Sequence, residues 1–302
     1  MNKKISIQLG IVFLIVVLYH LFAVHLSQAQ YVICAAAILL FGIPHGAIDH
    51  LLERHFYRRE NRFSSSQRFI LWYVLCMAAY LVVWMLLPFR ALLIFIALGI
   101  YHFGQEFIEE SCAVPNRKVG FLLWGSLILV MPLLFHYEDS IAYVHETTKI
   151  NLPAATDLQL NILAFSIPVV NLLYFSYLYF KKQIKQSVFM TVLAQLIVWT
   201  LVYWSTPFLI GFTLYFVVFH SFNSMQHQYE ALLRFKKQYR ITTYLRDLSA
   251  FTLLSYSGVV LLFFFIDWQQ WQQLMLYSLV FISVLTLPHM MVFEHFYAQR
   301  KA

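Results

Sequence analysis

The sequence predicts an all-α polytopic membrane helix bundle with about ten transmembrane helices. Three observations predict it: 61% of the 302 residues are hydrophobic, only 12% are charged, and long apolar runs recur along the whole chain. A soluble domain carries about 25% charged residues, whereas a membrane helix needs roughly 20 mostly apolar ones. No connection between the runs is long enough for a soluble domain. Residues 1–302 are therefore expected to form a single integral membrane domain.

The ten apolar runs are separated by short polar or basic connections. They cover residues 5–26, 31–52, 69–88, 91–110, 119–137, 159–180, 187–206, 208–230, 249–267 and 272–296. The first run follows Lys3 and Lys4, so a signal peptide cleaved after Ser27-Gln-Ala29 is an alternative reading. The apolar core of a signal peptide is only about 7–15 residues long. The length of this run favours an uncleaved first helix.

The basic residues orient the predicted helices. With the N-terminus in the cytoplasm, all but two of the 21 basic residues, Arg90 and Lys149, fall in cytoplasmic connections or termini. An excess of Lys and Arg on the cytoplasmic side is the rule for membrane proteins. We therefore expect a multi-pass protein of the cell inner (plasma) membrane with both termini cytoplasmic. The net charge of +7 is then a topology signal and does not indicate nucleic-acid binding. The chain has three cysteines, Cys34, Cys76 and Cys112, which lie in or beside apolar runs. An odd number of cysteines so placed does not indicate a disulfide framework.

Four of the twelve histidines fall inside predicted spans at nearly the same depth. His45, His102, His220 and His289 lie in spans that run in the same direction, each a little past the midpoint. An ionisable side chain in a span is costly and marks a functional site by default. Neutral imidazoles at one depth favour a metal site. Hydrogen bonding between helices, a proton or ion path and haem ligation stay open as alternatives. Interfacial or solvated positions are expected for His20, His25, His50, His55, His136 and His145.

Two acidic residues follow these histidines by four positions. Asp49 follows His45, and Glu106 follows His102. Positions four apart lie on one face of a continuous helix, and a ligating histidine commonly donates its second ring N–H to a carboxylate. We therefore expect Asp49 to orient His45 and Glu106 to orient His102, which makes both acids candidates for the catalytic machinery.

The residues around the four histidines resemble a known family. In chain order they are Gly42-Ile-Pro-His-Gly-Ala-Ile-Asp49, His102-Phe-Gly104, Tyr215-Phe-Val-Val-Phe-His-Ser221 and Leu287-Pro-His289. Over residues 42 to about 295 they resemble the Brp/Blh family of bacterial and archaeal membrane β-carotene 15,15′-dioxygenases. The resemblance implies a membrane enzyme that binds Fe(2+) through histidines. It also implies that the enzyme splits the central double bond of β-carotene with O2 into two retinal molecules.

The resemblance further implies a set of iron ligands. Matched residue by residue, three of them are His45, His102 and His220. The family's fourth ligand is the second histidine of a His-x-x-x-His pair, and this chain has Ser224 there. His227, His289 or a three-histidine site remain as options. A second departure is Glu106, since the family more often has an aspartate one residue later, where Phe107 stands.

The expected substrate is long, apolar and dissolved in the bilayer. Aromatic residues make up 18% of the chain, and those that adjoin the histidines are candidates to line a polyene channel: Tyr101, Phe103, Tyr215, Phe216 and Phe219. The expected partners are β-carotene, O2 and the lipid bilayer, with a microbial rhodopsin as acceptor of the retinal. One competing function is a related non-haem iron oxygenase acting on another carotenoid or a lipid. The other is a non-catalytic transporter or rhodopsin accessory protein.

Overall fold

The computed structural model describes residues 3–26, 29–57, 66–111, 114, 116–235, 238–265 and 271–299. All regular structure in these residues is helical, and no strand occurs among them, which confirms the all-α prediction. Part of the evidence for the predicted orientation lies outside the described residues, as do Ser27 and Gln28 of the alternative cleavage site. The basic residues concerned are Arg58, Arg59, Arg62, Lys236, Lys237, Arg300 and Lys301, and Cys112 also lies outside the described residues. The orientation stays a prediction.

Nine helical stretches of the described chain are long and apolar enough to cross a membrane. They correspond to nine of the ten predicted spans: Lys3–Phe22, Ala29–Arg54, Gln67–Leu86, Pro88–Ser111, Arg117–Phe135, Asp157–Phe180, Gln186–Ser205, Phe208–Arg234 and Tyr277–Ala298. The remaining prediction, residues 249–267, overlaps α13 (Ile241–Phe265), which is helical but is not among the nine. Length and composition thus support a polytopic membrane bundle.

The chain divides into two compact units, each built from three segments. Unit 1 consists of Met1–Ile38, Gly99–His145 and Asn151–Ser221, and unit 2 of Leu39–Leu98, Glu146–Ile150 and Phe222–Ala302. The segments alternate along the sequence, so neither unit is one continuous piece of chain. This division does not test the prediction of a single membrane domain, which stays a prediction.

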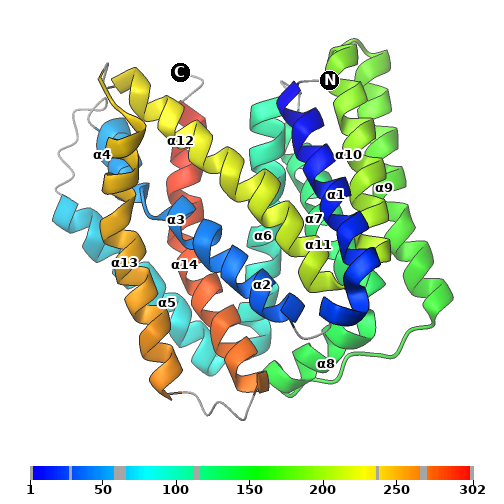
Figure 1. The fold of residues 1–302 in the computed structure, drawn as a ribbon, viewed down its shortest axis with the longest axis horizontal. Helices are drawn as coiled ribbons and strands as arrows, with labels where there is room; N and C mark the ends of the chain where they lie inside the picture. The colour runs from blue at the N-terminus through cyan, green and yellow to red at the C-terminus, as the bar shows by residue number, and fades with distance from the viewer. Residues whose placement is uncertain are drawn as a thin grey trace. The chain divides into compact units, whose positions relative to one another are not determined.

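Unit 1 contains both long and short helices. They are α1 (Lys3–Leu26), α2 (Ala29–Ala37), the second half of α6 (Pro88–Ser111), α7 (Arg117–Phe135), most of α8 (Tyr137–Thr148), α9 (Asp157–Phe180), α10 (Gln186–Ser205), α11 (Phe208–Leu214) and the π-helix η3 (Tyr215–Ser221). Helices α7, α9 and α10 pack side by side (Figure 1). Asn171 Nδ2 of α9 donates to the Leu123 carbonyl of α7 at 2.9 Å. The half-buried His136 ring donates to the Thr206 carbonyl at 3.0 Å, so it caps the end of α10.

Helices α6 and α7 approach each other closely at two glycines. A Cβ on Gly104 would lie 1.8 Å from the carbonyl oxygen of Phe121, and a Cβ on Gly125 would lie 1.7 Å from that of Ile100. Small residues permit such backbone contact between membrane helices. Because Gly104 follows His102 by two residues, this crossing holds the histidine-bearing part of α6 against α7.

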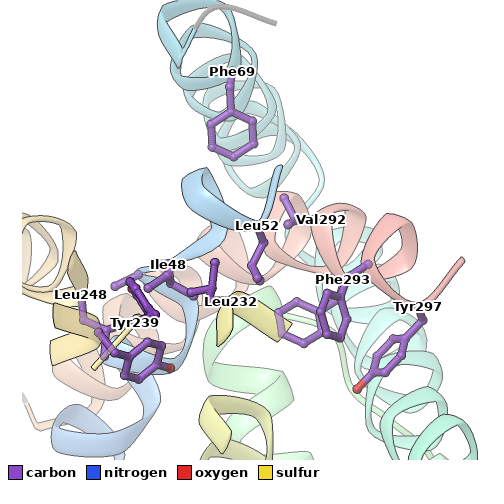
Figure 2. Packing of buried hydrophobic residues seen from close by; sticks show 12 residues of the cluster. Ile48, Leu52, Phe69, Leu232, Tyr239, Leu248, Val292, Phe293 and Tyr297 are labelled. Carbon is purple, nitrogen blue, oxygen red and sulfur yellow. The ribbon is translucent and has the colours of Figure 1, made fainter. Parts of the chain in front are cut away.

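Unit 2 contains the short helices that carry His45 and Asp49. It contains most of the π-helix η1 (Ile38–Gly42), α3 (Ile43–Gly46), α4 (Asp49–Tyr57), α5 (Ser66–Leu86), the first half of α6, α12 (Phe222–Phe235), α13 and α14 (Trp271–Gln299). Helix α14 packs against α4 and α5. The core gathers beside α4 (Figure 2) and includes Ile48, Leu52, Phe69, Leu232, Tyr239, Leu248, Val292, Phe293 and Tyr297.

The backbone around His45 departs twice from a regular α-helix. Pro44 has no N–H, and in a regular α-helix its ring would clash with the carbonyl four residues earlier. The wider π-helical turn η1 lies at those upstream residues. Helix α3 then ends at Gly46, and a turn at Ala47 and Ile48 separates it from α4. His45 and Asp49 therefore do not share one continuous helix.

Substituting Gly104 by alanine tests the close helix crossing. We expect Gly104→Ala to destabilise the protein by roughly 1–3 kcal/mol or more, because the added methyl group meets backbone that only a shift of α6 against α7 can relieve. Gly10→Ala is the matched control, since a Cβ there has no neighbour within 4 Å. Thermal unfolding in detergent measures both. Equal midpoints for the two variants would contradict the crossing.

Candidate functional site

The structure brings the four predicted histidines together as two pairs, one in each unit. In unit 1 the ring centroids of His102 and His220 are 5.0 Å apart, with an interplanar angle of 79°. In unit 2 those of His45 and His289 are 4.8 Å apart, at 85°. All four side chains are buried. Each unit thus holds two imidazoles edge to face in a water-poor interior.

The unit 1 pair is completed by a carboxylate. Glu106 of α6 accepts a hydrogen bond from Nδ1 of His220, which lies near the end of η3. The sequence predicts His102 as the partner of Glu106, and the structure shows a hydrogen bond from His220 to this carboxylate. His102 and Glu106 are one turn apart on α6, and η3 packs against the same face, so the carboxylate reaches the neighbouring segment. The Phe103 ring lies 4.8 Å from the His220 ring and shields it.

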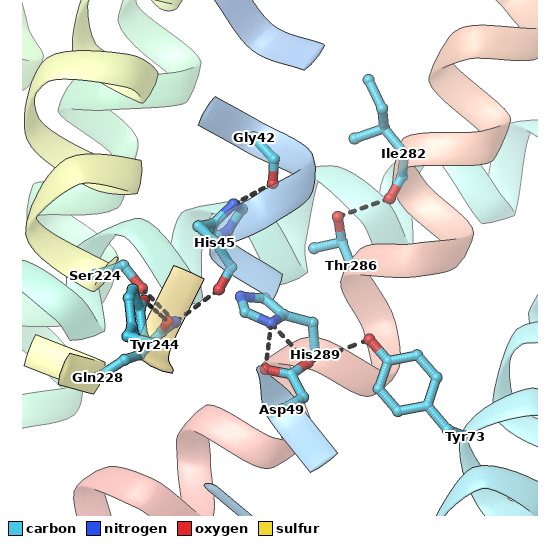
Figure 3. Close-up of polar contacts among 10 residues, drawn as sticks. All are labelled: Gly42, His45, Asp49, Tyr73, Ser224, Gln228, Tyr244, Ile282, Thr286 and His289. Atoms are coloured by element: carbon cyan, nitrogen blue, oxygen red, sulfur yellow. Dashed lines mark hydrogen bonds and ion pairs between the residues drawn. The ribbon is translucent and has the colours of Figure 1, made fainter. Parts of the chain in front are cut away.

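A carboxylate also bonds one histidine of the unit 2 pair, and this histidine is not the one that the sequence predicts (Figure 3). His289 Nδ1 bonds Asp49 at 2.9 Å (Oδ2) and 3.1 Å (Oδ1), and the Tyr73 hydroxyl donates to Oδ2 at 3.2 Å. The prediction that Asp49 orients His45 is wrong, because the turn at Ala47 and Ile48 breaks the four-residue helical relationship. Nδ1 of His45 instead donates to the carbonyl of Gly42.

The His289 ring packs against the backbone at Gly46, where no side chain is present. A Cβ on Gly46 would lie 3.4 Å from Nδ1 and 3.8 Å from Cε1 of His289. The imidazole therefore rests against the backbone directly after His45. A methyl group at this position would just touch the ring, and a branched side chain would displace it.

A buried amide connects the backbone of His45 to two further helices (Figure 3). Gln228 of α12 is fully buried, and its Nε2 donates to the His45 carbonyl at 2.6 Å and to Ser224 Oγ at 3.2 Å. Its Oε1 accepts a bond of 2.9 Å from the Tyr244 hydroxyl of α13. One glutamine thus joins α3, α12 and α13 and leaves Ser224 in the same network.

Two other histidines of unit 2 have different surroundings. His227 Nδ1 lies 4.0 Å from Oε2 of Glu230, one turn later on α12. The His50 ring packs at 4.5 Å on the Phe251 ring. Taken over the described residues, no three His, Cys, Asp or Glu side chains lie in an arrangement that could hold a metal ion. The metal ligand set therefore stays a prediction.

Comparison with known proteins decides the family. The β-carotene 15,15′-dioxygenase (BCD) family matches residues 36–297, which is most of the chain. The chain belongs to this family. A curated β-carotene 15,15′-dioxygenase from Uncultured marine bacterium 66A03 is 32% identical over 96 residues, covering 32% of each protein. The match thus spans about a third of that relative's length. No solved structure matches the chain.

The predicted resemblance to β-carotene 15,15′-dioxygenases is confirmed, and its motifs acquire physical roles. The Pro-His-Gly-Ala-x-Asp block of this dioxygenase-family chain supplies His45, the space at Gly46 and the carboxylate of Asp49. The His-Phe-Gly block supplies His102, the ring beside His220 and the glycine of the helix crossing. Each block therefore combines a histidine with the small or acidic residue that makes its position possible.

The five candidate channel aromatics have different surroundings. Tyr215 and Phe219 are buried against Trp199, with centroid distances of 5.1 and 5.3 Å, and so belong to the unit 1 core. Tyr101 packs edge-on against Phe121. The other two, Phe103 and Phe216, lie against the His220 ring, at 4.8 and 5.4 Å.

Sequence reasoning missed Tyr73, Gln228 and Tyr244. Two signals for Gln228 are present: it is polar inside an apolar run, and it follows Ser224 by four residues on α12. No comparable signal marks the tyrosines, because their hydroxyl partners lie on other helices far away in sequence. Tyr73 and Asp49 are 24 residues apart.

Replacing Gln228 by leucine tests the buried amide network. We expect Gln228→Leu to cost roughly 1–3 kcal/mol of stability, because buried polar groups on α3 and α13 lose a hydrogen-bond partner. Gln226→Leu on the same helix is the control. Gln226 bonds the half-exposed residue Glu230, so the change there should stay within about 0.5 kcal/mol. Chemical unfolding measures the free energy of unfolding of both variants. Equal values for Gln228→Leu and Gln226→Leu would refute the stabilising role of the network.

Proposed function

We propose that this protein cleaves β-carotene at the central 15,15′ double bond with O2, giving two retinal molecules, and that the reaction depends on Fe(2+). Membership of the β-carotene 15,15′-dioxygenase family over residues 36–297 carries the proposal. The two buried histidine pairs support it, because each contains an imidazole whose Nδ1 is held by a carboxylate. The atoms balance in this reaction, because one O2 and one β-carotene give two molecules of the aldehyde retinal.

The type of donor suits ferrous iron, although the described side chains do not come together as a group of three ligands. Imidazole nitrogens suit iron, and ligating histidines usually donate their other ring N–H to a carboxylate or backbone carbonyl. Three of the four rings do so, since the Nδ1 acceptors are Glu106, Asp49 and the Gly42 carbonyl. With the proton on Nδ1 in these bonds, Nε2 would be the atom left to hold the ion. The ligand candidates are His102 and His220 in unit 1, and His45 and His289 in unit 2.

A bound ferrous ion supplies the activation of O2. The chain's own residues supply orientation and exclusion of water. Glu106 holds the tautomer and angle of the His220 ring, and Asp49 with Tyr73 does the same for His289. All four imidazoles and both carboxylates are buried, so few competing water ligands can enter.

A column of aromatic rings in unit 1 suits a conjugated, apolar substrate. Phe208, Phe212 and Phe216 stack in turn at centroid distances of 5.9 and 5.7 Å, and Phe216 stacks on His220 at 5.4 Å. The three phenylalanines are half-buried, whereas His220 is buried. This arrangement supports a polyene path along α11 and η3 toward the histidine.

The location of the substrate agrees with the apolar helices. β-Carotene dissolves in the bilayer, and an intramembrane site receives it without passage through water. We further propose the cell inner membrane as the location, cytoplasmic termini, and a microbial rhodopsin as acceptor of the retinal. The distribution of basic residues supports the orientation.

Expression in a bacterial host that accumulates β-carotene tests the reaction. We expect the orange colour to fade and retinal to appear in extracted pigments, quantified by chromatography. His102→Ala should abolish both changes, because a proposed ligand is lost, whereas His20→Ala on the exposed face of α1 should retain them. Unchanged β-carotene with iron-loaded protein in the membrane would point to another substrate. Unchanged β-carotene with iron-free protein would reject the proposed chemistry.

Metal analysis of the purified protein tests the cofactor. We expect about one iron per chain, loss of activity on chelation and recovery on adding Fe(2+). Glu106→Gln should lower the iron affinity about 10–100-fold, because the His220 ring loses its charged acceptor. Glu109→Gln is the control on the same helix, since Glu109 pairs with Arg117 at 3.7 Å. Full activity in metal-free protein would exclude the iron.

A further inference from the structure

The π-helices η1 and η3 each return to α-helical bonding at their C-terminal end. A π turn joins a carbonyl to the N–H five residues later, whereas an α turn uses the N–H four residues later. At the return, two successive N–H groups close the last π turn and the first α turn. The carbonyl between their two acceptors lies three residues before the end of the π segment and has no donor in its own helix. A buried carbonyl without a donor is costly, so a group from elsewhere has to bond it.

In η3 this carbonyl belongs to Val218, three residues before Ser221. The side chain of Gln8 on α1 donates to it from Nε2 at 2.6 Å. Gln8 is buried although it lies in an apolar run, and both residues belong to unit 1. It also precedes residues 36–297, which match the family. The donor that η3 needs therefore comes from a helix outside the matched part of the chain.

The π-helix η1 receives a donor at the same position. Leu39 lies three residues before Gly42, the last residue of η1. Its partner in a π turn would be Pro44, which has no N–H to donate. The hydroxyl of Tyr256 on α13 donates to the Leu39 carbonyl at 3.1 Å, and both residues belong to unit 2. Each unit thus bonds the corresponding carbonyl of its π-helix with one side chain from another helix.

The π-helical form of η3 keeps an aromatic column straight. The column consists of Phe208, Phe212, Phe216 and His220, which follow one another by four residues and stack at centroid distances of 5.9, 5.7 and 5.4 Å. In an α-helix a step of four residues passes a full turn by about 40°, so three steps would drift by about 120°. A π turn holds more residues, so the steps inside η3 drift back. The change from α11 to η3 therefore holds the rings on one face.

We infer that Gln8 and Tyr256 are positioning residues that hold η3 and η1 in the π-helical form. Without the bond from Gln8, η3 can shift by one residue toward regular α-helix, which moves His220 about 1.5 Å along the helix and about 100° around it. The column of phenylalanines then no longer leads to the His220 ring. This consequence for a polyene rests on the proposed function, whereas the holding of the two π-helices does not.

Hydrogen exchange of the purified protein in detergent, read by mass spectrometry of peptides, tests the two side chains. Gln8→Met keeps a side chain of similar length and removes the donor, so amides of η3 should exchange about 10-fold faster or more while those of η1 stay unchanged. Tyr256→Phe removes a single oxygen and should do the reverse. It also tests the inference by itself if Gln8→Met fails to fold.

Asn171→Leu is the matched control for Gln8→Met. It removes another buried side-chain amide of unit 1 that donates to a backbone carbonyl of a neighbouring helix, at 2.9 Å, but one that does not contact η3. Exchange in η1 and η3 should then stay as in wild type. Unchanged exchange in the π-helix that faces a changed side chain overturns the role of that side chain, as does an equal rise in both π-helices.

Retinal formation tests the consequence for the column. Gln8→Met should lower the turnover of β-carotene roughly 10–100-fold, because a misplacement of about 1 Å is enough for such a loss. Asn171→Leu should keep the wild-type turnover at a temperature where both variants are folded. Wild-type turnover in a Gln8→Met protein whose η3 exchanges faster overturns the link to the column. Absence of retinal with the wild-type protein would instead overturn the proposed function and leave the exchange result standing.

Discussion

The cost of placing acidic side chains and imidazoles inside apolar helices controls much of this structure. A buried charge or polar group is tolerated only when it is paired and hydrogen-bonded. Asp49 and Glu106 meet this requirement in the same way, each through Nδ1 of a histidine from another segment of its own unit. The two carboxylate–imidazole bonds therefore stabilise the helix arrangement and orient the rings. Removing either partner leaves the other buried without its charge-assisted bond.

Irregular backbone delivers these side chains to their positions. The π-helix η3 carries His220, and η1 with Pro44 and the turn after Gly46 directs His45 and Asp49 onto different faces. Such departures are tolerated in membrane helices where the freed backbone groups are buried in protein. Gln228 illustrates the point, since its side chain takes up the His45 carbonyl. Close contact at Gly104 has the complementary effect, because it keeps α6 rigid against α7.

Each unit holds a pair of imidazoles with a carboxylate on one of them, but the side chains around the two pairs differ. His220 is flanked by aromatic rings, with Phe103 and Phe216 on it. His45 and His289 are surrounded by polar contacts to Gln228, Asp49 and Tyr73. The surroundings of the first pair are therefore mainly aromatic, and those of the second pair are mainly polar.

By itself the sequence determined the helical class, nine of the spans, the four histidines and the family, because hydropathy and motif residues are local properties. It also indicated that Asp49 and Glu106 serve histidines. Only the tertiary structure decided which histidines, because a buried acid bonds the partner that packing brings to it. The four-residue spacing gave His45 and His102, whereas the contacts give His289 and His220. The roles of Ser224, Gln228 and Tyr73 depend in the same way on helices that meet only after folding.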